Sequence, residues 1–220
     1  LCMSLGGTDP LDAAYLAGLE AFLKSLEVPW HSDHLCFSVA HGTATHELLP
    51  LPRNEETVRH VAARIRQAQD ALSTPLAIEN VTQYVVTDDT DLDEGDFVAA
   101  IVRESGCALM LDVNNVFVNA ANFGHDARAI LAKMPLDRVV QMHVAGHWYA
   151  EPDLIIDTHS EPVRDEVFEL LDWTLQRTGR VPVLLERDDD IPALPVLLDE
   201  VRRLDAIWRR APERTKDAAE

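Results

Sequence analysis

Short apolar runs alternate with longer segments of helical spacing along the chain, and this alternation constrains the fold more than any other feature. The apolar runs are typical of buried parallel strands and cover residues 34–40, 76–80, 108–113, 139–144 and 181–186. The segments between them predict helices over residues 10–26, 54–72, 94–105, 125–133, 162–178 and 193–209. Regular β-α alternation requires a parallel sheet that is covered by helices.

Both an open doubly wound sheet and a closed barrel satisfy this pattern, and polar side chains at the strand ends distinguish them. Five predicted strands each carry one acidic or histidine residue in or at their C-terminal part: His34, Glu79, Asp112, His143 and Glu186. The strands of a (β/α)8 barrel bring such side chains to one mouth, whereas an open sheet spreads them along an edge. We therefore predict an α/β fold of the TIM (β/α)8 barrel type.

The predicted barrel has fewer strands than a closed one. The run "LCMSL" at residues 1–5 is interpreted as the end of a strand, and about six strands are counted where a TIM barrel has eight. We expect a single barrel domain over residues 1–210 that lacks its first two strands. Residues 211–220, "APERTKDAAE", are expected to form a disordered tail.

Charge and cysteine content exclude several classes of protein. The formal net charge of −19 disfavours binding to nucleic acids or to anionic membranes, which are themselves polyanions. Apolar runs stay well short of the roughly 18 residues that a membrane-spanning helix needs. The three cysteines show no CxxC spacing, which favours a reducing compartment. Since no basic-then-apolar leader opens the sequence either, we expect a cytoplasmic protein.

The residue types at the strand ends favour a metal site. Histidine nitrogens and carboxylate oxygens suit iron, manganese or zinc, and the lack of paired cysteines disfavours thiolate sites. A single buried histidine is more often a core residue than a ligand, but five ionisable groups at five strand ends would be costly without a cation. Open positions beside histidine and carboxylate ligands are typical of non-heme iron sites that activate oxygen. Neither a GxSxG, a Walker nor a GxGxxG motif is present.

Several blocks of the sequence resemble one known family in order along the chain. They are "SDHLCFS", "LLPLP" followed by "EETVRHVAARI", "LAIENVTQY", "LMLDVNNVFVNAANFGHDA", "MHVAGHW", "DLIIDTHS" and "LLERDDDIP". By these motifs the chain resembles the multinuclear non-heme iron-dependent oxidative enzymes, a family long catalogued as a domain of unknown function that includes MbnB and TglH. The match covers essentially the whole chain.

This resemblance implies a xylose-isomerase-like barrel with two or three iron ions at its mouth and O2 as co-substrate. It implies oxidative modification of cysteines in a ribosomally synthesised precursor peptide, in bacterial natural-product biosynthesis, with a partner protein that recruits the peptide. The motifs assign catalytic and metal-binding roles to His34, Glu79, Asp112, His143 and Glu186. They assign further metal ligation to Asp157 and His159, with Asn115 and His147 as ligands or supporting residues.

Two departures and two alternatives accompany the resemblance. Relatives commonly carry Asn-His-Gly where this chain has Asn122, Phe123 and Gly124, with a histidine displaced to His125. Relatives also carry a metal-binding histidine in an "HG" pair just before the strand with which this chain begins. The alternatives are a divalent-metal sugar isomerase or phosphodiesterase on the same barrel, and a metal-poor binding protein derived from such an enzyme.

Overall fold

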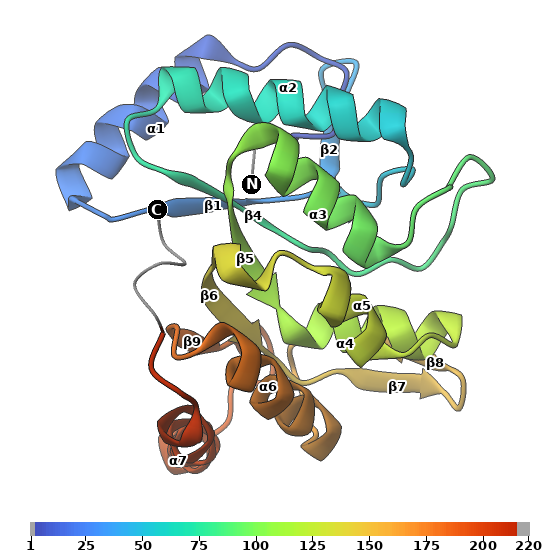
Figure 1. Ribbon diagram of the computed structural model, residues 1–220, viewed down its shortest axis with the longest axis vertical. Coiled ribbons are helices and arrows are strands. Elements are labelled where there is room, and N and C mark those ends of the chain that lie inside the picture. Colours follow the sequence, from blue (N-terminus) through green and yellow to red (C-terminus); the bar gives the residue numbers. More distant parts are fainter. Residues whose placement is uncertain (1–2, 215–220) are drawn as a thin grey trace. The chain divides into compact units, whose positions relative to one another are not determined.

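The computed structural model of the protein describes residues 3–214, which form two compact units (Figure 1). The first unit is Leu1–Met110 and the second is Leu111–Glu220. No helix among the described residues is both long and apolar enough to cross a bilayer.

The first unit begins with a helix and three successive strands, after which helices and strands alternate. Its elements are α1 (Ala13–Leu26), β1 (His31–His34), β2 (Phe37–Ala40), β3 (Thr43–Leu49), α2 (Glu55–Ala71), β4 (Leu76–Glu79), α3 (Glu94–Ser105) and β5 (Ala108–Asp112), whose last two residues belong to the second unit. Strand β4 pairs in parallel with both β1 and β5 and is buried along its whole length. The predicted parallel pairing of buried strands is therefore present here.

The helices of this unit follow from their caps and apolar faces. Asn54 caps α2 by accepting a hydrogen bond from the Thr57 N–H, and Asp93 caps α3 through the Asp96 N–H. Helix α2 buries Val58, Val61, Ala62, Ile65 and Ala68, which recur at helical spacing. With this face inward, α2 packs against α1 and α3 (Figure 1).

The predicted strand over residues 34–40 is wrong in its extent. Strand β1 ends at His34, and the apolar residues that follow form β2, which pairs antiparallel with β3. β1 itself consists of polar residues and is a strand because its backbone pairs with β4, which overrides its weak local preference. Of the predicted strand at residues 1–5, residues 1 and 2 lie outside the described part of the chain, and residues 3–5 are not in a strand.

The second unit contains the remaining elements. They are α4 (Val113–Phe123), α5 (Ala127–Lys133), the 3₁₀ turn η1 (Leu136–Arg138), β6 (Val139–Val144), β7 (Trp148–Glu151), β8 (Leu154–Ile156), α6 (Asp165–Thr178), β9 (Val183–Leu185) and α7 (Leu194–Arg210). Strands β6 and β9 are parallel neighbours, with Val144 opposite Leu185. The predicted strands over residues 139–144 and 181–186 are thus confirmed to within two residues.

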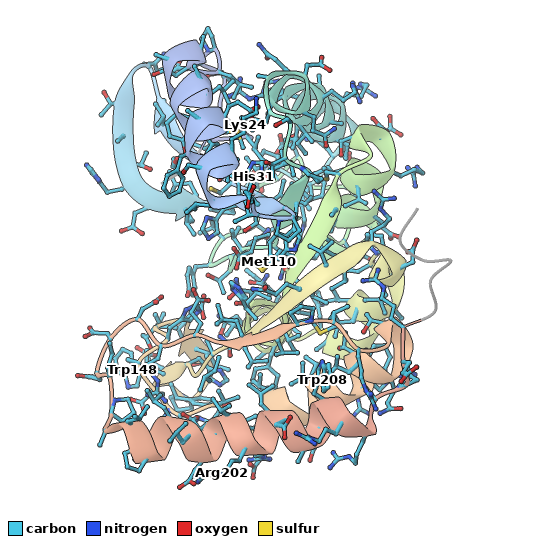
Figure 2. The ribbon with its side chains drawn as sticks, turned by 90° about the vertical axis from the view of Figure 1, so that its left-hand side faces the viewer. Lys24, His31, Met110, Trp148, Arg202 and Trp208 are labelled. Carbon is cyan, nitrogen blue, oxygen red and sulfur yellow. The ribbon has the colours of Figure 1, made fainter. Side chains whose placement is uncertain are left out.

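The sequence pattern did not predict α4 or the hairpin formed by β7 and β8. The two strands of the hairpin are antiparallel, with Trp148 opposite Ile156. Asn122 of α4 binds both backbone groups of Ile155: its Oδ1 accepts from the N–H at 2.8 Å, and its Nδ2 donates to the carbonyl at 2.9 Å. Trp148 lies at the surface of the hairpin and is 51% exposed (Figure 2).

The chain beyond α7 packs on the second unit further than expected. Ala211 is buried, and the Pro212 carbonyl accepts a hydrogen bond from the Arg180 N–H. Arg214 donates to the carbonyls of Val139 and Asp137. Of the expected disordered tail, residues 211–214 are therefore held by burial and hydrogen bonds, and residues 215–220 lie outside the described part of the chain.

Candidate metal centre

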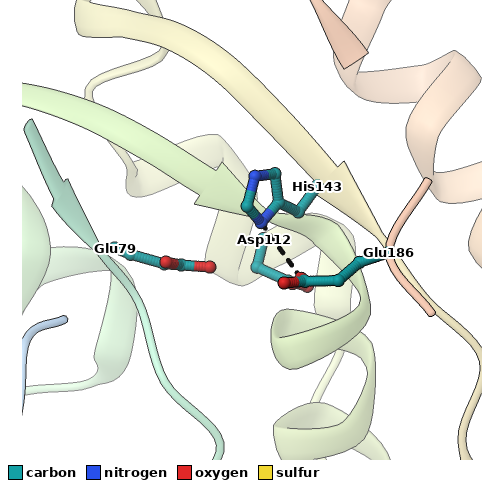
Figure 3. Close-up of side chains that lie close together, drawn as sticks. All are labelled: Glu79, Asp112, His143 and Glu186. Atoms are coloured by element: carbon teal, nitrogen blue, oxygen red, sulfur yellow. Dashed lines mark ion pairs between the residues drawn. The ribbon is translucent and has the colours of Figure 1, made fainter. Parts of the chain in front are cut away.

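Three predicted site residues of the second unit come together at the ends of its strands. Asp112 is the last residue of β5, His143 is the last but one of β6, and Glu186 directly follows β9. Each offers a ligand atom within 4.8 Å of those of the other two (Figure 3). Asp112 is fully buried and His143 is 8% exposed. All three lie at the carboxyl ends of parallel strands, the position at which the sequence predicts a metal site.

Local contacts fix how each of these side chains points. Asp112 ends β5 and caps α4 at once, because its Oδ1 accepts the Asn115 N–H at 2.8 Å. His143 Nδ1 lies 3.1 Å from Glu186 Oε2, while its Nε2 lies 3.0 Å from the Gln141 amide. Glu186 is placed by its backbone, since its N–H donates to the Val144 carbonyl. One imidazole and two carboxylates thus lie close together, with Asp112 and His143 buried and Glu186 partly exposed.

Glu186 also belongs to a second group, with His159 and Asp188, whose ligand atoms lie within 4.8 Å of one another. His159 Nδ1 lies 3.1 Å from Asp188 Oδ2 and 3.5 Å from Glu186 Oε2. On its other side, His159 Nε2 lies 2.9 Å from Asp157 Oδ1, a close ion pair that lacks the alignment of a hydrogen bond. The predicted ligands Asp157 and His159 therefore do face each other.

The charges around His159 outweigh its burial. Burial by itself lowers the pKa of the imidazole, but the contact with Asp157 and the charges of Asp112 and Glu186 raise that pKa to about 9. In the metal-free protein His159 is therefore an imidazolium at neutral pH. The carboxylates that stabilise this charge are the ones that would face a bound cation.

The loop that carries His159 is closely packed. His159 has φ 50°, in the left-handed region that few residues other than glycine adopt, and its carbonyl accepts the Asp188 N–H. A Cβ on Gly146 would lie 1.8 Å from the Glu161 carbonyl oxygen, so only glycine fits beneath this loop. A buried ion pair between Arg187 and Glu200, at 3.0 Å, holds its far end.

In the first unit, the structure brings two further predicted residues together. His34 and Glu79 are register partners at the ends of β1 and β4, and His34 Nε2 lies 3.3 Å from Glu79 Oε2. The Glu79 side chain is 9% exposed and that of His34 is 31% exposed. These two groups form a histidine–carboxylate pair of the same kind as His143 and Glu186.

Asn115 and His147, to which the family motifs assign a role as ligands or as residues that support the ligands, are both buried. Asn115 lies in the first turn of α4, where its N–H binds Asp112. His147 Nδ1 lies 2.8 Å from Asn114 Oδ1, and its ring stacks on Phe117 at 5.1 Å between centroids. Burial, followed by the charge of Arg164, lowers the pKa of His147 to about 4, so its ring is neutral.

Sequence reasoning missed two residues, Asp188 and Asn114. Asp188 follows Glu186 by two positions. In an extended chain, side chains two residues apart point to the same side, and this spacing could have indicated Asp188. Asn114 gave no comparable signal, because its partners lie 33 and 43 residues away. The displaced His125 is exposed at the end of α4 and belongs to neither ligand group.

The donor set suits a divalent transition metal. Imidazole nitrogen with two or more carboxylates is a ligand set for iron, manganese or zinc. The two cysteines in the described residues, Cys36 and Cys107, are buried and belong to neither ligand group. The residues present therefore fit a non-heme metal site without thiolate ligands.

The fold is that of xylose isomerase-like barrels. The chain superimposes on a xylose isomerase-like TIM barrel protein from Mycobacterium smegmatis, solved in complex with magnesium, with a TM-score of 0.54 at 12% identity, over 90% of this chain and 67% of that one. Among residues 3–214, five strands pair in parallel with at least one other strand: β1, β4, β5, β6 and β9. The predicted fold class is thus confirmed as a partial barrel of this type.

Sequence comparison assigns the family. A UPF0276 protein of Pseudomonas aeruginosa is 43% identical over 213 residues, which are 97% of this chain and 74% of the relative. One from Rhizorhabdus wittichii is 44% identical over 200 residues, 91% of this chain and 71% of the relative. The profile described as "RiPP precursor modification enzyme MbnB/TglH/ChrH" matches residues 1–209, RiPP denoting a ribosomally synthesised and post-translationally modified peptide. The chain therefore belongs to the MbnB/TglH/ChrH family of RiPP precursor modification enzymes.

Proposed function

We propose that the protein is an O2-dependent, multinuclear non-heme iron enzyme that oxidatively modifies cysteine residues of a ribosomally synthesised precursor peptide. The cluster of Asp112, His143 and Glu186, in a chain of this family, carries the proposal. Its nitrogen and oxygen donors match those of non-heme iron sites that keep positions open for other ligands. When bound, iron supplies the redox chemistry with O2 that amino acid side chains lack.

We propose two sets of iron ligands in the second unit and one in the first. Asp112, His143 and Glu186 form one set, and His159 and Asp188 form another beside the shared Glu186. Asp157 is proposed as a further ligand on the side of the opposite ring nitrogen of His159. Glu186 belongs to both groups of donors, and a carboxylate shared in this way supports a site with more than one metal ion. His34 and Glu79 are proposed as the ligands of the first unit, since they occupy strand-end positions of the same kind. Asn115 is proposed as a weaker donor beside Asp112 in the second unit.

The chain's own residues would fix the metal and leave room for the substrate. Buried contacts at Asp112 and His143 hold these ligands in place, whereas Glu186 and Asp188 are more exposed, with side chains 28% and 65% accessible. Substrate would then approach from the side of Glu186 and Asp188. We further propose a separate protein that recruits the precursor peptide, and a reaction in the cytoplasm, where that peptide is made.

Iron content and oxygen dependence test the proposal. The protein is expressed with the additional sequence that its relatives carry, purified without oxygen, loaded with Fe(II), and its iron counted by mass spectrometry. A cysteine-containing precursor peptide encoded beside its gene is then incubated with it, with and without O2. We expect more than one iron per chain and a mass change on a peptide cysteine only when O2 is present.

Variants connect this activity to the cluster. Glu186→Gln and His143→Ala should each abolish turnover while the protein remains folded, because residues at the barrel mouth serve the site more than the core. The control is His60→Ala, since His60 lies on α2 and its side chain binds only the Gly7 carbonyl among the described residues. One zinc and no iron, or turnover without O2, would instead favour a divalent-metal isomerase or phosphodiesterase. A chain that binds no metal would favour a binding protein.

A further inference from the structure

The buried side chain of Asn114 contacts both ends of the hairpin formed by β7 and β8. This hairpin separates His147 from Asp157 in the sequence. Asn114 is fully buried in the first turn of α4. Its Oδ1 lies 2.8 Å from His147 Nδ1, just before β7. Its Nδ2 donates to Asp157 Oδ1 at 2.7 Å, just after β8. One amide group therefore fixes the residue that precedes the hairpin and the residue that follows it.

These contacts determine which nitrogen of His147 carries the hydrogen. A carboxylate only accepts hydrogen bonds, so Asp157 must face the NH2 of Asn114, and the amide cannot be reversed. The oxygen of Asn114 then faces His147, and since an amide oxygen also only accepts, His147 Nδ1 must be the donor. The neutral ring is thereby held as its Nδ1–H tautomer, with a lone pair on Nε2.

The rest of the His147 environment leaves that lone pair available. The ring is fully buried, stacks on Phe117 and lies 5.4 Å from the ring of Tyr149 between centroids. Its Nε2 has no hydrogen-bond partner among residues 3–214. A buried nitrogen with a lone pair needs a partner, which a metal ion or a bound substrate can supply. Metal-binding histidines are commonly held in this way through their other nitrogen.

Asn114 also positions Asp157 against His159. The same oxygen of Asp157 that accepts the Asn114 N–H lies 2.9 Å from His159 Nε2. The side-chain torsions of Asp157 are thus restrained from the side of α4. Helix α4 contacts the hairpin at a third point through Asn122, whose side chain binds the backbone N–H and carbonyl of Ile155.

We propose that Asn114 is a positioning residue of the metal centre, which presents the Nε2 lone pair of His147 and directs Asp157 toward His159. The inference rests on the proposed function, because the positioned groups are taken to serve a metal ion. Asn114 itself would not bind the metal, since both ends of its amide are occupied. Asn122 offers a matched comparison, since it is an asparagine of the same helix that binds the same hairpin.

The tautomer of His147 is the direct test. Metal-free protein with ¹⁵N-labelled histidine shows by NMR which ring nitrogen carries hydrogen, and His147→Phe identifies the signal while keeping a flat ring in the stack. We expect the Nδ1–H tautomer in the wild type. Asn114→Leu removes both contacts at similar volume and should shift His147 to the Nε2–H form. Asn122→Leu loosens the hairpin without touching His147 and should keep the wild-type tautomer.

A second variant separates the two contacts. Asn114→Asp keeps an acceptor for His147 but cannot donate to Asp157 and places a like charge beside it. We expect the Nδ1–H tautomer to persist while Fe(II) bound per chain, counted after anaerobic loading, falls below the wild-type value. Asn122→Leu should bind Fe(II) as the wild type does. If Asn114→Leu does not fold, Asn114→Asp decides through its iron count.

The inference is overturned by an Nε2–H tautomer in the wild type, by an unchanged tautomer in Asn114→Leu, or by wild-type iron binding in Asn114→Asp. None of these measurements involves O2 or peptide. If the wild type binds Fe(II) and Asn114→Asp binds less of it, yet the wild type leaves the peptide unmodified, the proposed function is refuted and the positioning role is supported. Wild-type protein that binds no metal would overturn both.

Discussion

The charge of His159 should set the high-pH limit of stability of the metal-free protein. Burial alone lowers its pKa, but Asp157, Asp112 and Glu186 raise that pKa to about 9 from the ordinary value of 6.5. A raised pKa contributes stability that is fully present below pH 6.5 and is lost as the pH rises through about 9. At ~1.4 kcal/mol per pH unit, the interval from 6.5 to 9 corresponds to about 3 kcal/mol. The side chain is only 13% exposed, so solvent screening reduces this little.

Urea unfolding of chelator-treated protein at pH 6 and at pH 9.5 measures this loss. Tryptophan fluorescence reports mainly on the second unit, which contains Trp148, Trp173 and Trp208 of the four tryptophans. The wild type should lose about 3 kcal/mol of unfolding free energy between the two pH values. His159→Gln cannot be protonated in this range and should lose much less.

The comparison between proteins removes the contribution of other titrating groups. His125→Gln changes an exposed histidine of the same unit and should retain the wild-type pH dependence. The reasoning is refuted if His159→Gln loses as much stability as the wild type over this interval. It is equally refuted if the wild type is as stable at pH 9.5 as at pH 6.

Three other predictions concern the same unit. Gly146→Ala should lower the unfolding free energy by about 1–3 kcal/mol and reduce the iron bound per chain, because the new Cβ would overlap the Glu161 carbonyl. A variant with the same unfolding free energy and iron content as the wild type would contradict this. Glu200→Ala leaves the Arg187 side chain, 6% exposed, without its carboxylate and should cost about 3 kcal/mol in urea unfolding at pH 7, against a smaller loss for Glu200→Gln. Burial lowers the pKa of His147 to about 4, so the neutral ring should cost the folded protein about 3 kcal/mol of unfolding free energy as the pH falls from 6.5 to 4. Urea unfolding over this range should show the loss in the wild type, and His147→Phe should lack this contribution.

Much of the fold was predictable because its central strands are buried on both faces. Strand β4 and strand β5 read as continuous apolar runs, and their neighbours in sequence carry helical spacing. β1 was misplaced because its four residues, "HSDH", contain nothing apolar and become a strand only through pairing with β4. The apolar residues of β2 belong to a hairpin, which depends on contacts that a local pattern does not contain.

Helix α4 was missed for a different reason. Asp112 both ends β5 and caps the helix, so no loop residues mark the change from strand to helix. The helix itself is rich in valine and asparagine, which have low helix propensity. Its buried residues Val113, Val116 and Ala120 nevertheless follow helical spacing. The period was present in the sequence, but the preceding strand hid where it began.

The candidate site was predictable to the extent that it depends on strand ends. Asp112, His143 and Glu186 are brought together by the parallel sheet, so their proximity follows from the β-α pattern alone. Asp157 and His159 lie beyond an irregular hairpin, and only the family motif indicated them. Asn114 acts through hydrogen bonds to distant residues, and contacts of that kind cannot be predicted without the folded chain.

A proton on His159 and a bound cation are alternative ways to balance the same carboxylates. Asp157, Asp112 and Glu186 hold the imidazolium in the metal-free protein, and they are also the proposed metal ligands. A metal-binding imidazole must be neutral, so a cation that binds His159 below pH 9 has to release this proton. His147 is prepared in the opposite way, because burial and Arg164 keep its ring neutral before any metal arrives. In the second unit, His159 must therefore release a proton before it can bind a cation, whereas His147 can bind one without releasing a proton.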